Sequence, residues 1–387
     1  MVDIQKGLDE ARLKAFTREL IRTPSLSMEE EAISRIVETE MKSLGYDEIR
    51  VDDLFNVVGI IKGSGTGPTL LFNGHIDHAG VGSMKDPFSA EVIDGRAFDH
   101  DGPVIYGRGA CDMKGAVAAM VHAGAMIKQA GVSLSGNVLI TCVAREEMAR
   151  GEGIRRLLEN GLTADFAVSG EATGLQVYVG HRGKFEAKVT TRGRTSHGGY
   201  PQGGINAIFK MNAFFNALQA DYPLPDHDFL GKATVTALDI SASPGALTPI
   251  VPDRCEAVID RRFFPDETEE SLLEGFRQLF AAVKERDPEF EAVIEPLKWF
   301  PAMFTDPDEA IVQSMIRARR QILGETGEIG AWYFGVDGTF INQAGIPCVG
   351  LGPGNEYLAH TPRDVVPVRD LMDAARIYAA LIEDVCR

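Results

Sequence analysis

Residues 70–80, LLFNGHIDHAG, read as a buried strand that ends in polar side chains. The apolar run at 70–72 stops at Asn-Gly, as a buried strand does. His75 and Asp77 follow, and because they are two residues apart in extended backbone they point the same way. The pair suits two roles: both side chains could bind a metal ion, or Asp77 could orient the His75 ring by accepting its second N–H.

A second segment, YGRGACDMKG at 106–115, places a carboxylate in a comparable position. Asp112 lies in a glycine-punctuated turn just before a helical run at 116–129. A carboxylate at a strand-to-helix turn lies at the open end of an α/β sheet, where sites usually are. Taken alone, His75 could be a core histidine and Asp112 a helix N-cap, but further acids downstream favour a shared site.

Those acids also follow expected strands. Glu146 and Glu147 come after one strand and Glu171 after the next, and His360 ends the glycine-rich segment GLGPGNEYLAH. Strand ends far apart in sequence converge along one edge of a doubly wound sheet. Acids gathered there without cations would repel one another and raise one another's pKa values. Two histidines and several carboxylates suit zinc, cobalt or manganese.

Adjacent Glu146 and Glu147 are expected to differ in role. On an irregular segment after a strand, one can bind metal while its neighbour faces the substrate. A free glutamate beside a metal-bound water is the usual general base for hydrolysis. The alternative is a solvated pair at a helix N-terminus, where the helix dipole favours acids.

The composition describes an acidic globular protein. The 387 residues suffice for two domains, and 44 % hydrophobic residues argue against disorder. A formal net charge of −17 disfavours nucleic acid and anionic membranes as partners. Five scattered cysteines fit a reducing compartment. The polar N-terminus and the absence of a long apolar run predict a cytoplasmic protein that does not bind membranes.

The order of expected elements predicts an α/β domain interrupted by a smaller α+β domain. Strands and helices alternate in 1–179 and again in 297–387, as in a sheet covered by helices. Between them, 180–296 has the order β-α-β-β-α-β of a ferredoxin-like insertion. Near the N-terminus, SMEE at 27–30 reads as a capping box, and the helix it opens ends at Gly45 as a C′ residue.

The motifs GHIDHAG, GRGACDMKG, REE, SGEATG and AHTP, in this order and spacing, resemble the M20 family of metallopeptidases and deacylases over nearly the whole chain. The resemblance implies a zinc-exopeptidase-like mixed-sheet catalytic domain with a ferredoxin-like lid and dimerisation domain. It also implies two divalent metal ions, zinc first, with cobalt or manganese as alternatives. The implied ligands are His75 and Glu171 for one metal, Glu147 and His360 for the other, and Asp112 as the bridge.

The same resemblance assigns the remaining roles. Asp77 would support His75, and Glu146 would be the general base that passes a proton to the leaving amine. His197, in TSHGGYPQGGINAI, would reach the partner's site in a homodimer and help to stabilise the oxyanion. Arg262, in DRRFFP, would bind a substrate carboxylate through its guanidinium fork. The alternatives are a surface histidine in a turn and a salt-bridged strand arginine.

Two departures from the family pattern fall on substrate recognition. The family's Asn-Val-Ile-Pro reads PIVP at 249–252, and its GTSDGRF-like segment reads FGVDGTF, which keeps Asp337 but loses the small hydroxyl residues. We therefore expect an amidohydrolase for a small N-acyl amino acid or peptide-like amide. Alternatives are an exopeptidase (carboxypeptidase or dipeptidase), an aminohydrolase that releases ammonia, and a catalytically silent binding homologue.

Overall fold

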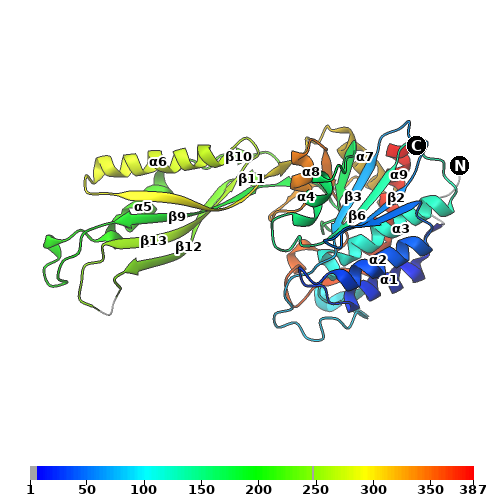
Figure 1. The fold of residues 1–387 in the computed structure, drawn as a ribbon, viewed down its shortest axis with the longest axis horizontal. Coiled ribbons are helices and arrows are strands. Elements are labelled where there is room, and N and C mark those ends of the chain that lie inside the picture. Colours follow the sequence, from blue (N-terminus) through cyan, green and yellow to red (C-terminus); the bar gives the residue numbers. More distant parts are fainter. Residues whose placement is uncertain (1–6, 246–247) are drawn as a thin grey trace. The chain divides into compact units, whose positions relative to one another are not determined.

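The computed structural model describes residues 7–245 and 248–387, which form two compact units (Figure 1). Unit 1 contains the chain up to His181 and again from Phe304 to Arg387, and unit 2 contains Arg182–Met303. The sequence placed the two boundaries at 179/180 and 296/297. Unit 1 is therefore assembled from two separate stretches of the chain.

A mixed sheet of nine strands organises unit 1. The strand order is β1-β2-β6-β3-β7-β17-β8-β15, with β16 paired to β8. The strands are β1 Glu48–Val51, β2 Val57–Ile61, β3 Leu70–His75, β6 Val138–Val143, β7 Phe166–Ser169, β8 Val177–His181, β15 Met303–Phe304, β16 Ile329–Trp332 and β17 Cys348–Gly350. β3 is parallel to β6 and β7, whereas β2 is antiparallel to β1 and β6. The expected mixed α/β architecture is confirmed.

The central strands are buried along their whole length and are mostly apolar. β3 (LLFNGH) and β6 (VLITCV) are buried at every residue. Strands that are covered on both faces show such continuous apolar runs instead of alternation. This burial agrees with the strand predicted at 70–72. The polar residues stand at the end of β3 and after the end of β6.

Helices pack around this sheet. They are α1 Glu10–Arg22, α2 Glu31–Ser43, α3 Gly115–Gln129, α4 Glu152–Glu159, α7 Ala310–Leu323, α8 Gly338–Gln343 and α9 Val368–Cys386. α3 is buried from Gly115 to Ile127 and contacts α1, α9 and β3. Its small residues let these neighbours approach closely, and an all-round apolar helix of this kind belongs in a core.

The two predicted ends of α2 have different outcomes. The capping box at 27–30 is wrong, because the N-cap is Glu30 and no side chain caps the helix. Ser27 and Glu30 instead bond to distant residues: the Ser27 hydroxyl donates to Asp77, and Glu30 accepts from the backbone N–H of Arg145. The C-terminal prediction is confirmed, since Gly45 follows the C-cap with a φ of 80°.

Short elements complete unit 1. A three-stranded sheet has the order β18-β5-β4, with β4 Glu91–Asp94, β5 Pro103–Tyr106 and β18 Val365–Pro367. The short helices are η2 Gly95–Phe98, η3 Ala110–Lys114 and η5 Glu356–Leu358. β18 and β5 pair antiparallel, so the chain after η5 lies beside the chain before η3.

Unit 2 is a four-stranded antiparallel sheet with two long helices. Along the chain its elements are β9 Gly183–Arg192, η4 Pro201–Gly203, α5 Ala207–Asp221, β10 Asp226–His227, β11 Gly231–Lys232, β12 Thr234–Ser243, β13 Arg254–Phe263, α6 Glu269–Arg286 and β14 Ala292–Phe300. The sheet order is β12-β13-β9-β14, and the small pair β10-β11 stands apart. Apolar side chains of α5 and α6 pack on β9 and β13 in a separate core, with α6 lying along the sheet (Figure 1).

Within 7–245 and 248–387, no helix is long and apolar enough to cross a membrane.

Candidate metal centre

Three parallel strands end beside one another and present candidate ligands. His75 is the last residue of β3, Glu146 and Glu147 follow β6, and Glu171 follows β7. Because β3 lies between β6 and β7 in parallel register, the carboxyl ends of these strands meet at one edge. The fold therefore brings together residues that are up to about a hundred positions apart in the chain.

Asp112 lies between two imidazoles. Its Oδ1 is 3.0 Å from Nε2 of His75, and its Oδ2 is 3.0 Å from Nε2 of His360. Asp112 belongs to η3, directly before α3, and His360 follows η5 in the left-handed region with a φ of 59°. Each oxygen of one carboxylate thus faces a different histidine.

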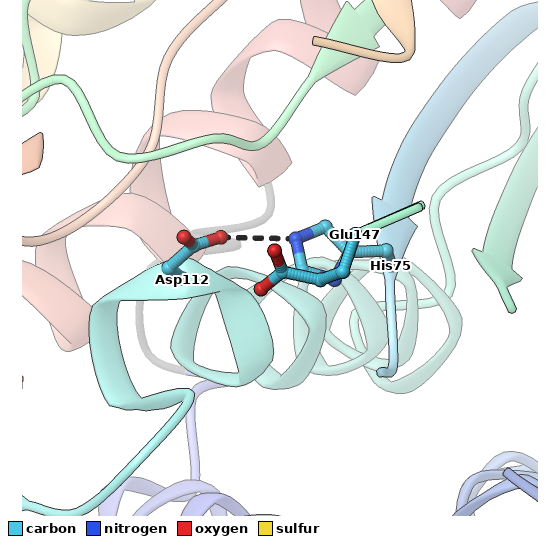
Figure 2. Close-up of side chains that lie close together, drawn as sticks. All are labelled: His75, Asp112 and Glu147. Atoms are coloured by element: carbon cyan, nitrogen blue, oxygen red, sulfur yellow. Dashed lines mark hydrogen bonds and ion pairs between the residues drawn. The ribbon is translucent and has the colours of Figure 1, made fainter. Parts of the chain in front are cut away.

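The remaining glutamates surround this trio. Oε2 of Glu147 lies 2.9 Å from Nε2 of His360, and Oε1 of Glu171 lies 3.5 Å from Nε2 of His75. Oε2 of Glu146 is 4.0 Å from the same His75 nitrogen. Among the residues that the structure describes, two sets of side chains are close enough to hold an ion. The first is His75, Asp112 and Glu147 (Figure 2), and the second is His75, Glu146 and Glu171.

Asp77 holds several of these groups in place. Nδ1 of His75 lies 3.0 Å from the Asp77 carbonyl oxygen and 3.4 Å from its carboxylate. The carboxylate also accepts the backbone N–H groups of Glu146 and Glu147, at 3.1 and 3.2 Å, and the Ser27 hydroxyl at 2.6 Å. With Nδ1 protonated and bonded to Asp77, Nε2 of His75 is free to bind a metal ion.

Asp364 supports the Asp112 turn, and the sequence analysis gave it no role. Its carboxylate accepts the backbone N–H groups of Gly109, at 2.7 Å, and Cys111, at 2.9 Å, and pairs with the Arg108 guanidinium at 3.0 Å. Gly109 has a φ of 82°, which favours glycine in this turn. The available signal was local: Asp364 is an acid in the same AHTPRD segment as His360.

Lys114 is a second supporting residue that the sequence analysis passed over. Its ammonium group is buried and donates to the carbonyl oxygens of Leu20, at 3.1 Å, and Thr23, at 2.8 Å. Burial lowers the pKa of Lys114 to about 7. These two bonds join the start of α3, next to Asp112, to the end of α1.

The acids of the centre are strongly perturbed. Burial raises the pKa of Glu146 well above its usual value, against the effect of His75, and the neighbouring carboxylates raise it further. Burial and the charge of Asp112 raise the pKa of Glu171 to about 8. Burial also raises the pKa of Asp337 to about 7. Closely packed buried carboxylates of this kind lack a counter-charge.

The donor set fits divalent cations. Oε1 of Glu147 is buried and has no hydrogen-bond partner among the described residues, and neither does Oδ2 of Asp337. Buried carboxylate oxygens rarely stay unpaired. Imidazole nitrogens and carboxylate oxygens at one point are ligands that zinc and related ions accept.

The two remaining candidate site residues from the sequence, His197 and Arg262, lie in unit 2. His197 is exposed on the chain after β9, and its Nδ1 accepts the backbone N–H of Gly199 at 3.0 Å. Arg262, on β13, forms two bonds to Asp260, with Nε–Oδ1 at 2.8 Å and Nη2–Oδ2 at 3.3 Å. Arg261 is buried on the other face of the strand and pairs with Glu267. Arg262 therefore already has a carboxylate partner within unit 2.

Comparisons with known proteins define the class. Peptidase family M20/M25/M40 matches residues 71–384, so the chain belongs to this family and is a hydrolase of amide bonds.

Individual relatives extend over nearly the whole chain. It is 33 % identical to the Escherichia coli (strain K12) protein named Uncharacterized protein YgeY, over 98 % of this chain and 96 % of that protein. It is 29 % identical to acetylornithine deacetylase of Myxococcus xanthus, over 86 % of this chain and 84 % of that enzyme. The fold resembles that of aminopeptidase PepT from Bacillus cereus, with a TM-score of 0.80, 22 % identity, and coverage of 98 % and 99 % of the two chains.

Proposed function

We propose that this protein is a dinuclear metal-dependent amidohydrolase that cleaves the amide bond of a small N-acyl amino acid or peptide-like substrate. The observation that carries the proposal is the position of Asp112, whose two oxygens each lie 3.0 Å from the Nε2 atom of a different histidine. A carboxylate that offers one oxygen to each of two imidazoles has the arrangement of a bridging ligand in a two-metal site.

The neighbouring contacts support a division of the ligands. His75 and Glu171 would hold one ion, His360 and Glu147 the other, and Asp112 both. Zinc suits this mixture of nitrogen and oxygen donors, and cobalt or manganese are the alternatives. Two bound cations would polarise the amide carbonyl and acidify an attacking water.

Glu146 would act as the general base. It is partly buried, its Oε2 lies 4.0 Å from Nε2 of His75, and its backbone N–H is bonded to Asp77. In this role its carboxylate takes the proton of the attacking water and delivers it to the leaving amine, which makes amine departure possible. Asp77 would keep both Glu146 and the His75 ring oriented.

Unit 2 would be a ferredoxin-like lid that also forms a homodimer. Its β-α-β-β-α-β order and the packing of both helices on one face support the first part. β12 is an edge strand of ten residues that exposes Leu238 and Ile240, and such an edge can pair with a second copy. His197 would then act in the partner's site, and Arg262 would exchange Asp260 for a substrate carboxylate.

The test is primary-amine and ammonia release from a panel of N-acyl amino acids and dipeptides, with zinc, cobalt or manganese added. The inactive control is Glu146→Gln, which lacks the proposed general base. Glu152→Gln is the matched control, because Glu152 lies in the next helix and pairs only with Arg145 among the contacts described. Amine release by the wild type and Glu152→Gln, but not by Glu146→Gln, is expected.

The other outcomes select the alternatives. Release from dipeptides alone would favour an exopeptidase, and ammonia alone an aminohydrolase. No release from any member, with metal bound, would contradict the proposal and favour a silent binding homologue.

A further inference from the structure

We propose that Tyr333 and Tyr357 form a subsite beside the metal centre that binds a planar, apolar group of the substrate. This inference rests on the proposed function, because it specifies which amides that site accepts. The two rings are stacked, with centroids 5.2 Å apart and an interplanar angle of 8°. Both are exposed, Tyr333 to 47 % and Tyr357 to 68 %.

The two tyrosines lie on segments that neighbour those carrying the candidate ligands. Tyr357 is in η5, three residues before His360, and η5 contacts η3, which carries Asp112. Tyr333 follows Trp332 at the end of β16, and the Trp332 indole N–H donates to the Ala172 carbonyl at 3.0 Å, next to the Glu171 position.

Electrostatics agree with this location. Burial raises the pKa of Tyr333 first, and the charges of Glu356, Tyr357 and Asp112 raise it further. The Tyr333 ring is therefore within electrostatic reach of the proposed bridging carboxylate. A group stacked on this pair would therefore lie near the segments that carry Asp112 and His360.

Hydrogen bonds hold the segment that carries Tyr357 and link Tyr333 to it. Glu356 is buried and accepts the Tyr178 hydroxyl at 2.7 Å. The Asn355 side chain accepts the backbone N–H of Tyr357 at 3.0 Å, and the Tyr333 hydroxyl lies 3.4 Å from the Glu356 carbonyl oxygen. Because these bonds hold the backbone at Tyr357 and the hydroxyl of Tyr333, less conformational entropy is lost when a ligand stacks on the pair.

The chemistry of the surface selects the ligand class. Parallel rings leave an outer face on which a further flat ring can stack, and aromatic pairs gain free energy beyond the area they bury. Phe334 extends the row, with its ring edge-on to Tyr333 at 4.9 Å. We therefore assign an aromatic or heteroaromatic ring, carried by the acyl group or by the amine part, as the occupant.

The experiment compares matched aromatic and aliphatic substrates. We would measure kcat and KM for N-acetyl-phenylalanine and N-acetyl-leucine, and for the N-benzoyl and N-acetyl forms of the better amine. The variants are Tyr357→Leu and Tyr333→Leu. Phe209→Leu is the control, because Phe209 is an aromatic residue 71 % exposed on α5 in unit 2.

The expected result is a rise in KM of about 3- to 10-fold for the ring-bearing substrate in Tyr357→Leu, with its kcat and the aliphatic substrate unchanged. The control should change neither. Equal losses for both substrates, or an unchanged aromatic preference, would overturn the proposal while leaving the amidohydrolase intact.

A binding measurement separates this proposal from the proposed function. Equilibrium dialysis of N-acetyl-phenylalanine and N-acetyl-leucine is carried out against two zinc-loaded proteins, Glu146→Gln and the double variant Glu146→Gln/Tyr357→Leu. Neither protein is expected to consume the ligands. Weaker binding of the aromatic ligand alone in the variant supports the subsite even if no amide is cleaved. Equal binding of the aromatic ligand by both proteins overturns it.

Discussion

Asp364 accepts a hydrogen bond from the backbone N–H of Cys111, with the two atoms 2.9 Å apart. This bond joins the segment that carries His360 to the turn that presents Asp112. The pairing of β18 with β5 reinforces the same connection, since β18 begins at the residue after Asp364. Two candidate ligands that are far apart in the chain are thus held as one structural piece.

Replacing Asp364 by asparagine should weaken zinc binding and lower the free energy of unfolding by about 3 kcal/mol. The neutral asparagine side chain leaves the buried Arg108 guanidinium without a counter-charge. Its NH2 group also replaces an oxygen that accepts hydrogen bonds, so that it faces a donor such as the backbone N–H of Gly109 or Cys111. Metal content after dialysis at limiting zinc, and urea unfolding, measure the two effects. Asp99→Asn, which breaks only an exposed pair with Arg363, should change stability by less than about 0.5 kcal/mol. Unaltered zinc affinity in Asp364→Asn would argue against a positioning role.

Asp112→Ala should lower the occupancy of both metal ions together, because each oxygen of this carboxylate faces a different histidine. Elemental analysis of the purified variant, in metal ions per chain, is the measurement. Asp101→Ala, an exposed acid of the same unit, should retain the wild-type content. A variant that keeps one ion at full occupancy would contradict bridging.

The metal-free protein should lose stability as the pH rises from about 4.5 to about 8. The pKa of Glu171 is raised from 4.5 to about 8 in the folded state. Its protonated carboxyl therefore contributes its full stabilisation below pH 4.5, the pKa in the unfolded chain, and this stabilisation is lost as the pH rises through about 8, the pKa in the folded protein. The expected loss is on the order of 5 kcal/mol. Thermal unfolding with a chelator present measures it. Glu171→Gln removes the titrating group, so its chelated form should show a flatter profile; an equally steep one would exclude Glu171 as the cause.

Glu40 should protect the fold against acid. Burial alone would raise its pKa, but the His122 ring, with Nε2 3.2 Å from the Glu40 carboxylate, and the hydrogen bonds from Arg12 outweigh burial and lower the pKa from 4.5 to about 2. The stabilisation is therefore complete above about pH 4.5 and is lost as the pH falls to about 2. Glu40→Gln should cost on the order of 2 kcal/mol at neutral pH and much less at about pH 2. The control, Glu31→Gln, affects only an exposed pair with Arg35. A constant difference between wild type and Glu40→Gln across this range would refute the assignment.

Mixing His197→Ala with Glu146→Gln subunits should restore part of the activity if His197 acts in the partner's site. Each hybrid dimer would then contain one site with both wild-type residues. Activity of the mixture, after exchange is verified by mass spectrometry of differently tagged chains, is the measurement. Absence of recovery in proven heterodimers would count against action across the dimer.

Local patterns in the sequence determined the elements that carry the candidate centre. The apolar run of β3 ends at His75, and the glycine-rich turn before α3 contains Asp112. Because parallel strands align their carboxyl ends, the convergence of His75 with the acids after β6 and β7 followed from topology. Element type and side-chain chemistry are short-range properties, which is why the sequence was sufficient to predict them.

Only the tertiary structure decided the supporting contacts. Ser27 has the sequence pattern of a helix cap, yet its hydroxyl bonds to Asp77. Asp364 bonds to a turn about 250 residues earlier, and Tyr333 stacks on Tyr357 from a different loop. A polar or aromatic side chain takes whichever partner the completed fold places within a few ångströms, and no local pattern specifies a partner that comes from a distant part of the chain.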